Sequence, residues 1–143
     1  MLYFAYSANI DPAHLAEVSP DATFEFIAHL PEWKMEFTIA NGKGGIPSVR
    51  PLPGNTVWGA VFTIPDADLD AIDAREAEEG RARVETQAMD REGKRHDVIT
   101  HVSANGDGTE LDPEPGYLGA MVRGGRHWNL PAGWVMALEE HLR

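Results

Sequence analysis

The sequence contains no cysteine in its 143 residues. This absence excludes disulfides, catalysis by a thiolate and zinc sites built on cysteine. Basic residues are also scarce, because 12 Lys and Arg stand against 23 Asp and Glu, which gives a formal net charge of −11 at pH 7. Nucleic acids and anionic membranes are bound by basic surfaces, so we expect neither to be a partner.

The sequence also lacks an apolar run long enough to span a membrane as a helix, and no basic stretch precedes the short apolar segment at residues 2–6. We therefore predict a cytoplasmic protein. The hydrophobic fraction of 43% over this length is sufficient to form a core. We expect one domain that covers residues 1–143.

The order of the predicted elements indicates the fold class. Apolar runs and alternating patterns predict strands, and capping signals with helical spacing predict helices. The strands are expected at 2–6, 23–28, 33–39, 56–64, 83–89 and 97–103, and the helices after Asp11-Pro12 and at 65–79, 115–127 and 132–142. A bend is expected at Pro31-Glu32, and an extended stretch through Val49 is expected to end at Pro51 and Pro53-Gly54. This order favours an α+β fold with a mostly antiparallel, barrel-like sheet and a few flanking helices.

One acid lies on the apolar face of the helix predicted from LDAIDAREAEEG. At about 100° per residue, Glu76 shares the face of Leu69 and Ile72. An ionised carboxylate is costly to bury without partners. Three alternatives follow: the helix frays before Glu76, Glu76 is buried in an ion pair with an arginine, or Glu76 lines a pocket where it transfers protons.

Four segments resemble, in order, the motifs of the γ-glutamylcyclotransferase family. The family patterns are FAYGSN, PxPGxxVWGVV, LxxLDxxE and PSxxYLxxxxxGAxxxGLP. The matching segments here are FAYSAN at 4–9, PLPGNTVWGAV at 51–61, LDAIDARE at 69–76, and the tail from Pro115-Gly116-Tyr117-Leu118 through Gly124-Gly125 to Asn129-Leu130-Pro131. The chain resembles a divergent member, since it has YSAN where the family pattern has YGSN.

The resemblance implies a reaction on a small γ-glutamyl substrate. The α-amine of the substrate attacks its own γ-carbonyl, which closes 5-oxoproline and releases an amine or amino acid, as in glutathione metabolism. No metal and no organic cofactor is implied. The resemblance assigns the catalytic acid to Glu76 and substrate binding to Phe4, Ala5, Tyr6, Ser7, Ala8, Asn9 and Tyr117.

The chemistry explains why such residues would be needed. Ring closure requires the substrate to be held in one conformer, the amine to lose a proton, and the carbonyl oxygen to meet fixed hydrogen-bond donors. Backbone N–H groups of a tight turn after a strand can supply those donors. A non-catalytic small-molecule binding module on the same fold is the alternative, because Ser7-Ala8 replaces Gly-Ser in that turn.

Overall fold

The computed structural model describes residues 1–103 and 108–142. In this part of the chain the strands are β1 (Leu2–Ala5), β2 (Thr23–Ala40), β3 (Gly45–Thr63), β4 (Arg81–Asp90) and β5 (Arg95–Ser103). The helices are α1 (Pro12–Ala16), α2 (Leu69–Glu78), α3 (Pro115–His127) and α4 (Ala132–Glu140), with short 3₁₀ turns η1 (Ala8–Ile10) and η2 (Asp66–Asp68). The predicted α+β class is confirmed.

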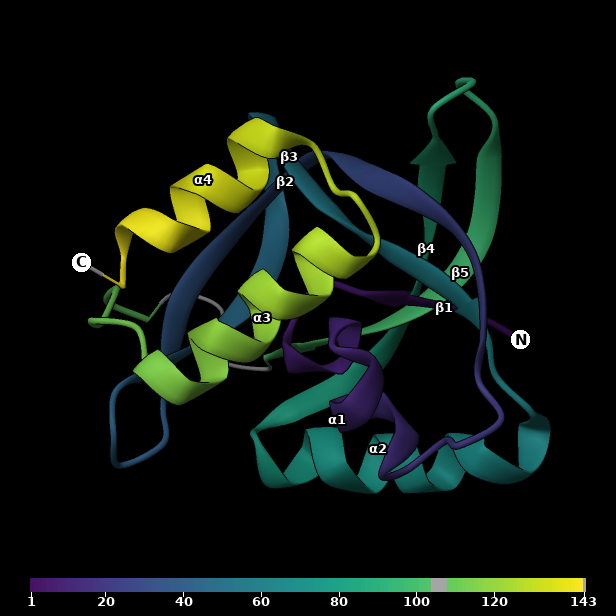
Figure 1. The fold of residues 1–143 in the computed structure, drawn as a ribbon, viewed down its shortest axis with the longest axis horizontal. Coiled ribbons are helices and arrows are strands. Elements are labelled where there is room, and N and C mark those ends of the chain that lie inside the picture. The colour runs from purple at the N-terminus through teal and green to yellow at the C-terminus, as the bar shows by residue number, and fades with distance from the viewer. Residues whose placement is uncertain (104–107, 143) are drawn as a thin grey trace.

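The strands form a closed barrel in the order β1-β3-β2-β4-β5 (Figure 1). All strand pairs are antiparallel except β1 and β5, which meet in parallel at Tyr3 and Ile99. Strands β2 and β3 pair with each other over most of their length, whereas, in the described residues, β1 pairs with β3 only at residues 60–63 and β4 pairs with β2 only at Ala28 and His29. The mostly antiparallel, barrel-like sheet that the sequence predicts is therefore present.

Strands β2 and β3 are longer than predicted. The two strands expected at 23–28 and 33–39 form the single strand β2, which has an irregularity in register between Pro31 and Trp33. The prediction that the extended stretch ends at Pro51 and Pro53-Gly54 is wrong, because β3 continues to Thr63. Residues 52–55 of β3 lie opposite the single residue Glu32 of β2, which makes this part of β3 a bulge. Pro53 lies in the bulge, where its missing N–H breaks no hydrogen bond between the strands.

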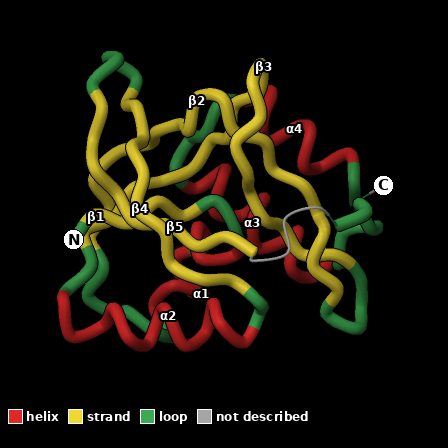
Figure 2. Tube along the Cα trace, turned by 180° about the vertical axis from the view of Figure 1, so that it is seen from behind, coloured by secondary structure: helices red, strands yellow, loops and turns green. Residues whose placement is uncertain are grey.

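The helices lie outside the barrel. In Figure 1, α3 and α4 cross in front of the sheet, and α1 and α2 lie together at the bottom; Figure 2 shows the strands uncovered from behind. Asp11 caps α1 by accepting a hydrogen bond from the N–H of Ala13 at 3.3 Å, as the Asp-Pro signal predicts. None of the helices in the described residues has the length and apolar character needed to cross a membrane.

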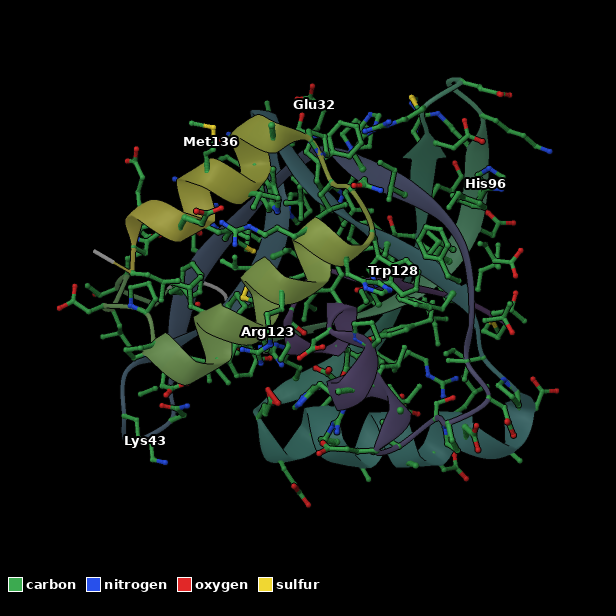
Figure 3. All side chains as sticks on the ribbon, viewed as in Figure 1. Glu32, Lys43, His96, Arg123, Trp128 and Met136 are labelled. Carbon is green, nitrogen blue, oxygen red and sulfur yellow. The ribbon has the colours of Figure 1, made fainter. Side chains whose placement is uncertain are left out.

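Helix α3 packs directly on the turn η1 through a glycine. A Cβ atom added to Gly124 would lie 2.4 Å from the carbonyl carbon of Ile10 and 2.5 Å from its Cγ2. The indole of Trp128, just after the end of α3 (Figure 3), donates a hydrogen bond to the carbonyl of the same Ile10 at 2.8 Å. The end of β1 and the turn after it are thereby fixed against α3.

We expect Gly124→Ala to lower the free energy of unfolding by about 1–3 kcal/mol, because the added methyl group overpacks the contact with Ile10. Gly119→Ala is the matched control in the same helix, where a Cβ would meet only an ordinary contact at 3.5 Å. That control should be neutral or stabilising by up to about 1 kcal/mol. Urea unfolding measures both, and equal effects would contradict the close approach.

Candidate functional site

The six residues predicted to bind substrate connect β1 to α1. Phe4 and Ala5 end β1, and Ala8 and Asn9 begin η1. Tyr6 and Ser7 lie between them, and all six residues are buried. Ser7 has φ −101° and ψ −150°, an extended conformation that any L-residue adopts. The serine at the family's glycine position therefore requires no left-handed backbone.

Asn9 joins this turn to helix α2. Its Nδ2 donates to the hydroxyl of Tyr3 at 2.9 Å and to Oε1 of Glu76 at 3.1 Å. Its Oδ1 accepts a hydrogen bond from Arg75, whose guanidinium also donates to the carbonyl of His14 at 2.8 Å. The amide of Asn9 is thus held at both ends, and its orientation toward Glu76 is fixed.

Glu76 points inward, as the helical spacing predicts. Only 4% of its side chain is exposed, and Ile72 is buried on the same face of α2. Oε2 of Glu76 accepts a hydrogen bond from Nη1 of Arg81 at 2.9 Å. The buried ion pair is therefore present and the frayed helix is wrong, whereas proton transfer by Glu76 stays a prediction. Asn9 on Oε1 and Arg81 on Oε2 compensate the burial of the carboxylate.

Arg81 reaches Glu76 because the chain reverses after α2. Gly80 has φ 86°, the left-handed conformation that commonly ends helices. Arg81 then begins β4, five residues after Glu76, and its guanidinium is fully buried. Its Nε and Nη2 donate to the carbonyl of Pro47 on β3, at 2.9 and 2.6 Å. Burial alone would lower the pKa of Arg81, but the neighbouring phenols and carboxylates hold it above its ordinary value, so the guanidinium is charged.

Tyr117 and Glu79 complete the cluster. Nη1 of Arg81 also donates to Oε2 of Glu79 at 2.8 Å, and Nη2 donates to the hydroxyl of Tyr117 at 3.2 Å. The hydroxyl of Tyr117 donates to Oε2 of Glu79 at 3.0 Å. The pKa of Tyr117 is raised to about 12, mainly by burial. The charge of Arg81 acts against this rise, and the charges of Glu79 and Glu76 add to it. The phenol is consequently a neutral donor at physiological pH.

Two cavities flank Tyr117 and His14. One of about 420 Å³ is also lined by Ala8 and by Arg123, which pairs with Asp11 at 3.2 Å. Arg123 is labelled in Figure 3. The other, of about 350 Å³, is also lined by Glu79. Neither set of lining residues includes Glu76. A larger hollow of about 520 Å³ lies over β4 and β5, away from this cluster.

Sequence reasoning located Glu76, Asn9 and Tyr117 but missed Arg81, Glu79 and Tyr3. A glycine just after the helix, followed at once by an arginine, is the signal that could have identified Arg81. The glycine turns the chain back and leaves the arginine next to the last turn of the helix. Glu79 and Tyr3 carry no comparable signal, since their contacts depend on how α3 and the turn meet.

Comparison with known proteins places the chain in a family. The model of the AIG2-like family matches residues 56–138, which is more than half of the chain and includes Glu76, Arg81 and Tyr117. The chain belongs to the AIG2-like family.

Similar proteins from two mammals are both named γ-glutamylcyclotransferase. The chain is 28% identical to the γ-glutamylcyclotransferase of Homo sapiens, across 91% of this chain and 72% of the human protein, and equally to that of Mus musculus. A solved structure of a γ-glutamyl cyclotransferase superposes with a TM-score of 0.89 at 25% identity, over 97% of this chain and 86% of the other. YkqA of Bacillus subtilis shares the fold, with a TM-score of 0.84 at 21% identity over 99% of this chain and 54% of its own. The resemblance seen in the sequence motifs is confirmed.

We expect Arg81→Met to lower the free energy of unfolding by about 3–5 kcal/mol, because it leaves Glu76 buried without its counter-charge. Arg83→Met is the matched control on the same strand, since Arg83 pairs with Asp73 in a partly exposed bridge. It should cost less than about 1 kcal/mol. Equal losses in urea unfolding at pH 7 would show that the buried pair does not carry this stability.

Proposed function

We propose that this chain is a γ-glutamylcyclotransferase that closes 5-oxoproline from a small γ-glutamyl amide and releases an amine or amino acid. The observation that carries the proposal is one hydrogen-bonded cluster built from three distant segments. Asn9 links the turn after β1 to Glu76, and Arg81 links Glu76 to Tyr117. The family motifs single out Asn9, Glu76 and Tyr117 among these residues, and the relatives bear the name of this activity.

Proximity supplies much of the catalysis in this proposal. The nucleophile and the carbonyl belong to the same substrate molecule, so the protein needs only to hold the ring-closing conformer. The cavities of about 420 and 350 Å³ beside Tyr117 are of the size that binds small molecules. The N–H groups that begin the turn η1 have no partner within that turn, which makes them candidate donors to the carbonyl oxygen.

Glu76 is the proposed general base and then general acid. It takes a proton from the attacking α-amine and returns one to the departing nitrogen. Asn9 and Arg81 hold one oxygen each, so the carboxylate is oriented before substrate arrives. Tyr117 is the proposed substrate-binding residue at the wall of both cavities, and its hydroxyl hydrogen is already donated to Glu79. The proposed reaction itself requires neither metal nor organic cofactor, and we place it in the cytoplasm.

We expect Glu76→Gln to reduce release of 5-oxoproline by at least about 10²-fold while the fold is retained, because the amide keeps the shape but accepts no proton. The substrates are a panel of γ-glutamyl amino acids, γ-glutamyl dipeptides and γ-glutamyl amines, with 5-oxoproline measured by mass spectrometry. Glu78→Gln is the matched control, since Glu78 is an exposed acid on the same helix.

Turnover near that of the wild type in Glu76→Gln would refute the assignment of the base. Binding of panel members to the wild-type protein without release of 5-oxoproline from any of them would contradict the enzyme and support a binding module. Thermal unfolding of both variants shows whether a lost activity reflects a lost fold.

A further inference from the structure

The proposed reaction moves two protons when the substrate binds as an ammonium ion. The substrate α-amine is an ammonium ion at neutral pH, because the ordinary pKa of an α-amino group is about 8. When it becomes the lactam N–H, its nitrogen loses two protons. Its electron pair forms the bond to the γ-carbon, and the electron pair of the broken amide bond goes to the departing nitrogen. That nitrogen gains two protons and leaves as an ammonium ion, so the balance closes.

Glu76 can hold only one of these two protons at a time. It is also enclosed, with 4% of its side chain exposed, whereas 22% of the side chain of Glu79 is exposed. The two acids share a single nitrogen, since Oε2 of each accepts from Nη1 of Arg81, at 2.9 and 2.8 Å. Glu79 lines the cavity of about 350 Å³, and Glu76 is absent from that lining. The second acid of the cluster therefore lies between the enclosed acid and the cavity.

We propose that Glu79 is a second proton carrier, which takes the first proton from the substrate ammonium in the cavity and returns it to the departing amine. This inference rests on the proposed function. Glu79 is suited to the step because Tyr117 and Arg81 both donate to its Oε2, which orients the carboxylate toward the cavity wall. Glu76 then receives the second proton, as the bond to the γ-carbon forms.

The charged and titratable groups that face Glu79 come from four elements. They are Glu76 and Glu78 on α2, Arg81 on β4, Tyr117 on α3 and His14 on α1. Burial, followed by the charge of Arg75, lowers the pKa of His14 below its ordinary value of 6.5. The pKa of Tyr117 is about 12, and that of Arg81 is raised. These three groups therefore keep their charge between pH 7.0 and 9.5.

The test compares kcat/KM of the wild type and Glu79→Gln at pH 7.0 and pH 9.5, on the panel member that the wild type turns over fastest. Without Glu79, only substrate that is already a neutral amine can react. That fraction is about one in eleven at pH 7.0 and nearly all at pH 9.5, so we expect a loss of about tenfold at pH 7.0 and almost none at pH 9.5. Glu78→Gln, which removes the same charge from the same cavity, should show no such dependence on pH.

A loss in Glu79→Gln that is equal at both pH values would overturn the inference, as a structural role predicts, and would leave the proposed function standing. The same pH-dependent loss in Glu78→Gln would also overturn it, because the charge of the cavity alone would then explain the effect. Absence of turnover by the wild type on the whole panel would instead refute the proposed function, and this inference with it. Thermal unfolding tests whether Glu79→Gln preserves the fold, as we expect because the glutamine can still accept the hydrogen bond from Tyr117.

Discussion

The buried ion pair between Glu76 and Arg81 is the interaction on which the arrangement of this site depends. A carboxylate on the inner face of α2 requires a counter-charge, and the guanidinium that supplies it requires acceptors of its own. Those acceptors are the carbonyl of Pro47 on β3, Glu79 at the end of α2 and the phenol of Tyr117 on α3. Satisfying one charge thus ties α2, β4, β3 and α3 together at one place beside the barrel.

The same guanidinium binds two acids that differ in exposure. Nη1 of Arg81 is shared by Glu76 and Glu79, so neither carboxylate has the whole guanidinium to itself. One cation balances two anions, and a positive group brought by a substrate would be attracted to the remaining charge. Because Glu79 lines a cavity, the attraction for a positive group acts where a small molecule can enter. Burial of one acid and exposure of the other therefore give the pair distinct places in the proposed reaction.

The sequence allowed the fold class and the inward position of Glu76 to be predicted, because both follow from local periodicity. It did not allow the full length of β3 to be predicted, since Pro51 and Pro53 argue locally against a strand, yet Pro51 stays in register with Trp33 and Pro53 lies in the bulge opposite Glu32. Arg81 was missed as a partner because its place depends on the turn at Gly80 and on burial against Pro47. The cavities beside Tyr117 are lined by residues that are distant in the sequence, so no local pattern encodes them.

The replacement of Gly-Ser by Ser7-Ala8 is compatible with a working turn. Ser7 lies in extended backbone, so the turn does not need a glycine there. Ser7 lowers the pKa of Tyr117, against the larger effect of burial. The hydroxyl stands one residue earlier here than in the pattern FAYGSN. Ala8 adds no polar side-chain atom to the cavity of about 420 Å³, whose polar lining includes Tyr117, His14 and Arg123. The change at Ser7-Ala8 is therefore accommodated in the backbone of the proposed substrate-binding turn.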